Sequence, residues 1–180
     1  MKKLLLILLP LIFLVSSCQE HVQEEKFAPG SVTVGIAANA EIDSIFNTLN
    51  GLNISIREMW GFTYLAPLPA DSVNYLINLL NQKPYINTTS GWSATTSTVY
   101  YSSSANAIMI TCPLFDMDTI NQVDLLSILE LQHMEDGHNG YKYMCLKVAE
   151  GTEKHWVEEL KKYPFVTWSE LDHVMNMDPL

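Results

Sequence analysis

The chain carries an internal repeat, and this feature limits its fold more than any other. Residues 72–86 and 152–166 follow one plan, in which a polar start leads into an amphipathic helical period, a proline and an apolar run. Pro84 and Pro164 predict where two helices end, because proline lacks an amide hydrogen and disfavours helix in the residue before it. A repeated segment indicates a structural unit that is used twice. We therefore expect two similar halves.

The same order of elements is expected in both halves. Hydrophobic periodicity predicts strand, helix, two strands, helix and strand each time. In the first half the expected elements are strand 32–36, helix 41–49, strands 54–60 and 62–65, helix 71–82 and strand 85–89. In the second half they are strand 107–112, helix 119–126, strands 128–135 and 141–148, helix 152–162 and strand 165–171. This order is typical of the ferredoxin-like fold, so we predict an α+β chain of two tandem ferredoxin-like units with antiparallel sheets.

Domain boundaries follow from these elements. The first unit is expected to cover residues 30–89 and the second residues 107–180. Between them, the Ser/Thr-rich segment 90–106 is expected to be a linker with one extra strand around Val99. The Asp-Gly-His-Asn-Gly sequence at 136–140 predicts a tight hairpin turn in the second unit, because these residue types adopt positive φ readily.

A leader precedes the two units. Lys2 and Lys3 stand before an apolar run at 4–15, which is too short to cross a bilayer that needs about 20 helical residues. The sequence Val-Ser-Ser-Cys that ends at Cys18 resembles the lipobox of bacterial lipoproteins. This resemblance implies that residues 1–17 are a signal peptide and that Cys18 is the lipidated first residue of the mature protein. The alternative is an ordinary secretory signal with an incidental cysteine.

Polar residues follow the cysteine, so we expect residues 18–29 to form a lipidated, flexible tether. Gln19 is not the aspartate that retains some lipoproteins in an inner membrane. The acidic cluster at 20–25 resembles the surface-export signal of Bacteroides-type lipoproteins, although an acidic tether also favours solubility. The lipobox and the duplicated halves together resemble uncharacterised lipoproteins of such bacteria. The expected location is the outer membrane, with the domain either periplasmic or surface-exposed.

The mature domain is acidic. The whole chain has 10 Lys and Arg against 20 Asp and Glu, and removal of Lys2 and Lys3 with the leader leaves 8 against 20, a formal charge of −12. Such a surface repels nucleic acid and anionic lipid head groups. We therefore expect contact with the membrane through the lipid alone, no nucleic-acid binding, and a protein of the cell envelope as partner.

Two cysteines lie within the expected units, Cys112 and Cys145. Both fall in expected central strands. An extracytoplasmic compartment permits a disulfide between them, and the alternative is two small, buried hydrophobic residues. Their spacing matches no metal-binding motif.

Few residues suggest chemistry. His133, Glu135 and His138 could bind a divalent metal, but strand alternation places the first two on one face and His138 in a turn, so no tetrahedral ligand set is specified. Asp172 and His173 are neighbours on an expected strand and face opposite sides, which disfavours a catalytic pair. The sequence has no nucleophile elbow and no phosphate-binding glycine loop. We therefore expect neither an enzyme nor a bound metal or cofactor.

Three Asp-Ser/Thr-aliphatic sequences occur in the chain. They resemble the O-glycosylation sites of Bacteroides-type periplasmic proteins, which would carry glycans on Ser44, Ser72 and Thr119. Each also lies where a helix is expected to begin, and Asp, Ser and Thr are preferred N-cap residues. Capping and glycosylation are both compatible with these positions.

The segment 158–174 resembles the closing part of the propeptide inhibitors of subtilisin-like proteases, a ferredoxin-like family. The resemblance lies in a helix, a turn that contains Pro164 and a strand that carries the acidic Glu170. In that family the tail after the strand enters the protease cleft. The resemblance would place residues 176–180 in such a cleft.

Three functional hypotheses follow. The first is a non-catalytic, membrane-anchored lipoprotein that presents a sheet edge or a groove between its halves to another protein. The second is a propeptide-like inhibitor of subtilisin-like serine proteases. The third is the binding of a small ligand or a glycan between the two halves.

Overall fold

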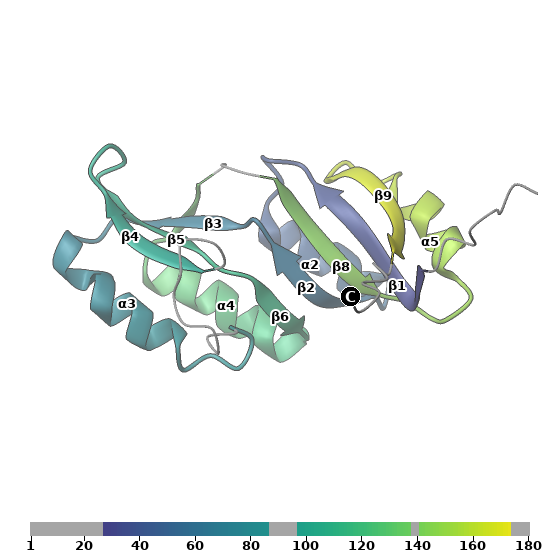
Figure 1. Cartoon of the computed structure of the whole chain (residues 1–180), viewed down its shortest axis with the longest axis horizontal. Coiled ribbons are helices and arrows are strands. Elements are labelled where there is room, and N and C mark those ends of the chain that lie inside the picture. The colour runs from purple at the N-terminus through teal and green to yellow at the C-terminus, as the bar shows by residue number, and fades with distance from the viewer. Residues whose placement is uncertain (1–26, 87–96, 138–140, 174–180) are drawn as a thin grey trace, which may run out of the picture.

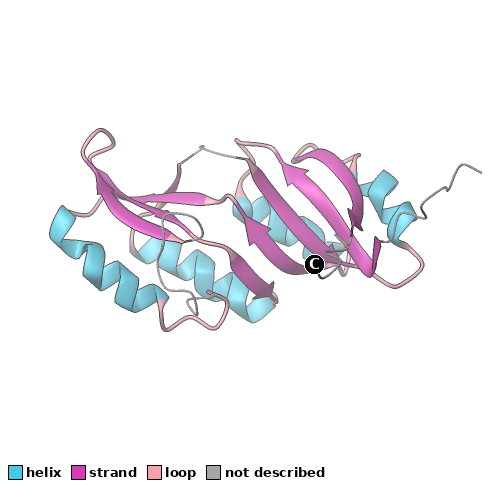
Figure 2. Cartoon of the chain, in the orientation of Figure 1, coloured by secondary structure: helices cyan, strands magenta, loops and turns pink. Residues whose placement is uncertain are grey.

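The computed structural model describes residues 27–86, 97–137 and 141–173 (Figure 1). These residues form a mixed α+β fold with two antiparallel sheets of five and four strands and four α-helices. The two sheets follow one another along the long axis of the molecule (Figure 2). None of the helices in the described ranges is long and apolar enough to cross a membrane.

The five-stranded sheet has the neighbour order β6-β2-β8-β1-β9. Its strands are β1 (Phe27–Ile36), β2 (Ser55–Trp60), β6 (Leu114–Met117), β8 (Lys142–Lys147) and β9 (Val166–His173). Helices α2 (Ile42–Gly51) and α5 (Glu153–Leu160) pack on one face of this sheet (Figure 1). Alternate strand residues such as Val32, Val34, Met144 and Leu146 point toward these helices and are fully buried, because side chains alternate across a strand.

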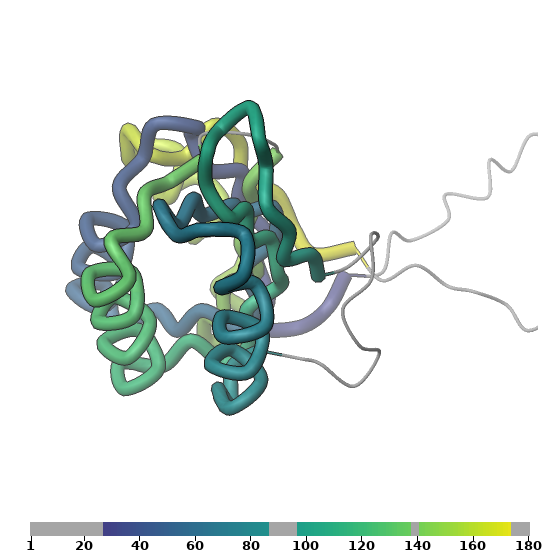
Figure 3. Tube along the Cα trace, turned by 90° about the vertical axis from the view of Figure 1, so that its left-hand side faces the viewer, coloured from purple at the N-terminus to yellow at the C-terminus, as the bar shows by residue number. Residues whose placement is uncertain are grey.

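The four-stranded sheet has the neighbour order β4-β5-β3-β7. Its strands are β3 (Thr63–Ala66), β4 (Thr98–Ser102), β5 (Ala107–Thr111) and β7 (Glu135–Asp136). The short 3-10 turn η1 (Ala70–Ser72) leads into α3 (Val73–Leu80), and α4 (Thr119–Leu131) lies beside α3 (Figure 3). The buried residues Tyr64, Ile108, Ile110, Leu76 and Leu125 belong to a core that is continuous with that of the first sheet.

Each sheet draws its strands from both expected halves, which differs from the predicted tandem arrangement. In the five-stranded sheet, β1 and β2 come from the expected first unit, whereas β6, β8 and β9 come from the second. The chain between β2 and β8 builds the four-stranded sheet and also supplies β6. Leaving out β6, the four strands of each sheet can be numbered along the chain. Both sheets then have the same neighbour order, which is β9-β1-β8-β2 in one and β7-β3-β5-β4 in the other. The segment that forms the four-stranded sheet thus lies between β2 and β8 of the five-stranded sheet along the chain.

Gly61 marks the point where the chain leaves the first sheet. Its φ is +75°, and a Cβ there would lie 2.1 Å from the carbonyl oxygen of Tyr141. The outgoing and returning connections are therefore in close contact at this junction. Strand β3 pairs with β5 and β7 in the other sheet. The expected hairpin of strands 54–60 and 62–65 does not form.

The side chain of Lys142 is a buried contact at the junction between the two sheets. Its side chain is fully buried at the start of β8, and its ammonium group forms an ion pair with Asp136 of β7. The same group donates a hydrogen bond to the carbonyl oxygen of Ala38 at 3.0 Å and lies 5.5 Å from the centre of the Phe62 ring. A buried ammonium needs such partners, because burial without them is strongly unfavourable.

Two further expectations in the second half are wrong. The first half of the predicted strand 128–135 is helix, because α4 continues to Leu131 and buries Ile128 one turn after Leu125. Strands β7 and β8 lie in different sheets, so residues 136–140 do not close a hairpin between them. Residues 138–140 themselves lie outside the described ranges.

Other expected elements are present. The two repeated helices α3 and α5 end before Pro84 and Pro164, as predicted from the prolines. The strand expected within the linker is β4. Of the expected strand 85–89, the described part contributes a single bridge between Ile86 and Leu114, and residues 87–89 lie outside the described ranges.

Candidate functional site

Among the described residues, no helix packs on one face of the five-stranded sheet. We call it the open face. Two clefts occur on it, and no helix residue of the described chain lines either of them. A β-bulge contributes to this face: Ile56 pairs with Leu146 and Glu58 pairs with Cys145, so β2 has one extra residue at Arg57. The bulge allows Arg57 and Glu58 to reach the same side of the sheet, where strict alternation would separate them.

Five aromatic rings form a continuous row across the open face. Trp60 stacks on its cross-strand partner Tyr143 with ring centroids 6.2 Å apart and an interplanar angle of 6°. Tyr143 lies 6.4 Å from Tyr141, and Tyr141 stacks on Trp168 at 6.0 Å. Phe115 of β6 meets Trp60 edge-on at 5.8 Å. Tyr141 is 70% exposed, and the other four rings are partly buried.

Trp168 lies flat on the backbone of β1. Its register partner is Gly35, and a Cβ at that position would be 1.9 Å from the indole Nε1. The glycine therefore makes room for the ring. Trp168 Nε1 is buried and has no hydrogen-bond partner among the described residues.

Arg57 is the centre of a polar network beside the aromatic row. Its guanidinium donates to Asp172 at 2.7 Å and to Glu58 at 3.2 Å. Asp172 also accepts a hydrogen bond from Ser31 Oγ at 2.7 Å, and Glu58 accepts one from Trp60 Nε1 at 3.0 Å. Partial burial lowers the pKa of Arg57, but its hydrogen bond and charge attraction to Asp172 outweigh this and raise the pKa above its ordinary value.

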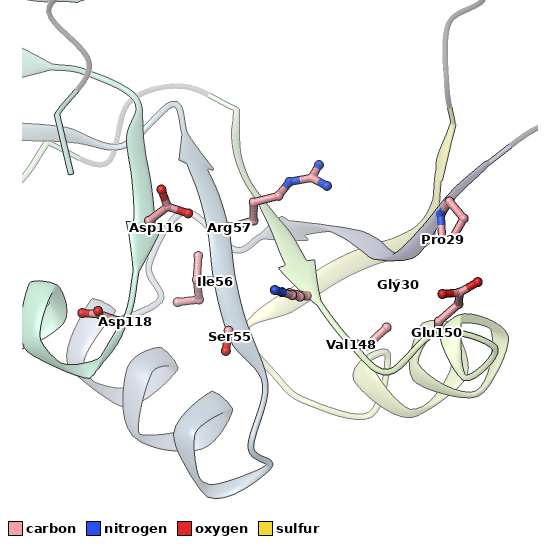
Figure 4. Close-up of a pocket in the computed structure, with 10 residues that line it drawn as sticks. Pro29, Gly30, Ser55, Ile56, Arg57, Asp116, Asp118, Val148 and Glu150 are labelled. Atoms are coloured by element: carbon pink, nitrogen blue, oxygen red, sulfur yellow. The ribbon is translucent and has the colours of Figure 1, made fainter. Parts of the chain in front are cut away.

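Two clefts meet at Arg57, which lines both of them. The first has a volume of about 520 Å³ and contains Trp60, Tyr143, Trp168 and Glu170 among its lining residues. The second, of about 590 Å³, lies at the end of the sheet where β1 and β2 begin and β8 ends (Figure 4). In Figure 4, Asp116 and Asp118 lie on one side of this second cleft and Glu150 on the other, with Arg57 between them.

A smaller cleft of about 220 Å³ lies where the start of α2 meets the region of β3 and α4. Residues near the start of α2, among them Ala40 and Ile42, line one side of it, and Phe62, Tyr64 and Leu129 line the other. Its lining residues come from both expected halves, as do those of the two clefts on the open face. It is less than half the volume of either cleft on the open face.

The two cysteines of the described chain are free, buried thiols. Cys112 follows β5 of one sheet and Cys145 lies on β8 of the other. Burial raises the pKa of Cys112 to about 12. Burial also raises the pKa of Cys145, whose Sγ lies 3.7 Å from Thr33 Oγ1 on the open face. Neither thiol is therefore activated as a nucleophile, since the thiolate is the reactive form.

The three candidate glycosylation residues lie near helix starts. Ser44 is exposed in the first turn of α2, Thr119 is exposed as the first residue of α4, and Ser72 is partly buried directly before α3. Asp118 caps α4, because its carboxylate accepts a hydrogen bond from the backbone N–H of Asn121 at 2.8 Å. Helices α2 and α3 begin without a side-chain cap. Capping thus accounts for one of the three sequences.

The other candidate residues do not come together as a chemical centre. His133 follows α4, Glu135 lies in β7, and His138 is outside the described ranges. Within the described residues, no three His, Cys, Asp or Glu side chains are close enough to hold a metal ion. Asp172 is bound to Arg57 and Ser31, and the exposed His173 ends β9. Cys18 and residues 176–180 also lie outside the described ranges.

Comparison with known proteins gives no relative: no protein-family model, no curated protein and no solved structure matches the chain. The candidate site therefore depends on geometry alone. Sequence reasoning missed Arg57, Glu58 and Gly35, because the bulge and the cross-strand packing are properties of the folded sheet. Tyr141 and Tyr143 did give a signal, since their period of two indicates one face of a strand.

Proposed function

We propose that the chain is a lipid-anchored protein of the cell envelope that binds another protein through its open face, without catalysis. The observation that carries the proposal is the aromatic row of Phe115, Trp60, Tyr143, Tyr141 and Trp168 on a sheet face with no described helix over it. Aromatic side chains contribute strongly to protein interfaces, and a polar rim normally surrounds them. The Arg57 network and the flanking carboxylates supply such a rim.

A binding role fits the chemistry of the face better than a catalytic one. Arg57 and Asp172 are paired with one another at 2.7 Å, so each side chain already has a charged partner on the open face. The raised pKa of Cys145 keeps the thiol protonated at neutral pH. What the face offers a ligand is apolar ring surface, hydrogen bonding and charge.

The proposed anchor is the lipid on Cys18, in the outer membrane. β1 begins at Phe27, and Pro29 and Gly30 line the second cleft of the open face. The chain from Cys18 to Phe27 would reach at most about 30 Å if fully extended. The open face would therefore work close to the membrane, where envelope proteins are available as partners.

We also propose that both sheets are ferredoxin-like units, one nested within the other. When the four strands of each unit are numbered along the chain, both sheets have the neighbour order fourth, first, third, second. In the first unit α2 and α5 follow its first and third strands. In the second, α3 follows the first strand, and α4 comes between the third and the fourth. This supports two β-α-β-β-α-β units rather than an unrelated mixed fold.

Inhibition of a subtilisin-like protease is the second candidate. It is favoured by the order of α5, Pro164 and β9, which follows the expected helix, turn and strand. The tail 176–180 would enter the protease cleft. If the full domain inhibits such a protease and a form that lacks 176–180 does not, this candidate is supported. Equal inhibition by both forms, or by neither, rejects it.

The leading proposal is tested by cross-linked capture from the native envelope with two tyrosine variants. Tyr141→Ala removes the most exposed ring of the open face, and Tyr75→Ala removes a ring of 52% exposure on α3 of the other unit. We expect the first variant to lose the captured partner and the second to retain it. Equal capture by both variants would reject the open face as the binding surface.

A further inference from the structure

The open face has a marked excess of negative charge. Around its two clefts lie six carboxylates, those of Glu58, Asp116, Asp118, Glu150, Glu170 and Asp172. The cations that line the same clefts are Arg57 and Lys147, with His173 at the edge. The positive charge of Arg57 is already matched by Asp172 and Glu58. A partner therefore meets a field that attracts cations and repels anions.

The aromatic row favours the same kind of partner. Lysine ammonium and arginine guanidinium groups are attracted to the faces of Trp and Tyr rings. The open face places two Trp and two Tyr rings next to carboxylates: Trp168 and Glu170 line one cleft together with Trp60 and Glu58. A cation bound there would contact a ring and a carboxylate at once. Neither feature favours an acidic segment.

We propose that the partner presents a basic, extended peptide segment, rich in lysine or arginine, to the open face. This inference rests on the proposed function and names the chemistry of its partner. Five strands spaced about 4.8 Å apart give the face a width of about 19 Å. An extended segment of about six residues would cross it. Its basic side chains would lie against the aromatic row and pair with the carboxylates on both sides of Arg57.

The test measures binding of a synthetic hexalysine peptide by calorimetry, with hexaglutamate and a neutral oligosaccharide as comparison probes. The informative variant is the double substitution Glu150→Gln and Glu170→Gln, at two exposed positions that each line one cleft. Its matched control is Glu130→Gln with Glu135→Gln, which removes the same formal charge from exposed positions on α4 and β7. Any effect of overall charge is therefore the same in both.

We expect hexalysine to bind, and the cleft variant to weaken it by about fivefold or more, since each exposed pair contributes modestly. The control variant should change affinity by less than about twofold. Raising the salt from about 50 to about 200 mM should weaken binding to the wild-type domain. Tyr141→Ala should weaken it as well.

Three results would overturn the inference. The first is an absence of hexalysine binding, the second is an equal loss in the cleft and control variants, and the third is binding of the oligosaccharide or hexaglutamate in place of hexalysine. The proposed function is tested separately by the captured partner. If capture depends on Tyr141 and yet is unchanged by the cleft variant and by competing hexalysine, the open face is the interface, but the proposal of a basic peptide segment is wrong. If capture does not depend on Tyr141, the proposed function itself fails.

Discussion

Gly35 of β1 lies directly beneath the indole of Trp168, so close that a Cβ at position 35 would be 1.9 Å from Nε1. Gly35→Ala must therefore displace the ring or the strand. We expect it to lower the free energy of unfolding by about 1–3 kcal/mol, as overpacking does elsewhere. Chemical denaturation with tryptophan fluorescence measures both the loss and the changed surroundings of the indole.

The control for this substitution is Gly51→Ala at the end of α2, where no atom beyond the adjacent residues and the helix's own backbone lies within 4 Å of the added Cβ. This change should be neutral or slightly stabilising, because alanine favours helix. Equal unfolding free energies for the two variants would show that Trp168 does not depend on the space above Gly35.

Arg57 and Asp172 are expected to be energetically coupled. Their atoms are 2.7 Å apart in a partly buried setting, and Ser31 also donates to the carboxylate. A double-mutant cycle with Arg57→Ala and Asp172→Ala should give a coupling of about 1–2 kcal/mol, because charge-assisted hydrogen bonds exceed neutral ones. The exposed pair Lys161 and Glu158 on the end of α5 provides the comparison and should couple by less than about 0.5 kcal/mol. If the coupling energy of Arg57 and Asp172 is no greater than that of Lys161 and Glu158, the network at Arg57 is contradicted.

The junction between the sheets should be sensitive to Asp136. Asp136→Asn leaves the fully buried ammonium of Lys142 without its carboxylate partner. We expect a loss of about 3 kcal/mol in the free energy of unfolding, as for other buried pairs broken on one side. Glu135→Gln, at the exposed neighbouring position, should change it by less than about 0.5 kcal/mol. Thermal or urea unfolding measures the loss of stability in both variants. Equal losses for Asp136→Asn and Glu135→Gln would contradict the buried ion pair.

Stability should fall in acid partly through Glu153. Its carboxylate accepts backbone hydrogen bonds from Gly30 at 2.6 Å and Gly151 at 3.1 Å, and these bonds lower its pKa below the ordinary value. A folded-state pKa below the unfolded one stabilises the protein above the unfolded value of about 4.3, and this contribution disappears as pH falls through the folded value. The unfolding curve of Glu153→Gln should therefore depend less on pH below about 5 than that of the wild type. Parallel curves would refute this role.

The sequence predicted the elements of this fold better than their partners. Helices α3 and α5 end where Pro84 and Pro164 require, because a missing amide hydrogen acts locally. A nested pair of β-α-β-β-α-β units and a tandem pair have the same order of strands and helices along the chain. The choice between them depends on long-range pairing, such as that of Val34 with Met144, which periodicity does not reveal. Gly61 marks the point where the chain passes from one sheet to the other, but a single glycine in a sequence does not predict such a crossing.

In the candidate site, too, local features can be predicted from the sequence, whereas contacts between strands cannot. The period of two between Tyr141 and Tyr143 is a pattern of the sequence that is typical of one strand face. The row depends on the position of β8 between β2 and β1, which places Trp60 of β2 on one side of β8 and Trp168 of β9 on the other. Arg57 reaches this face through a bulge that depends on its neighbours. The side of the sheet left without a helix could not be inferred, since it follows from where α2 and α5 pack.

The most direct test of the account is site-specific photo-crosslinking in the native envelope. A photoreactive phenylalanine analogue is placed at Tyr141 on the open face or at Tyr75 on α3, both well exposed. If the open face binds the partner, position 141 gives a specific covalent adduct with one envelope protein and position 75 gives none. An adduct from position 75 alone, or none from position 141, would contradict the claim that the open face binds the partner.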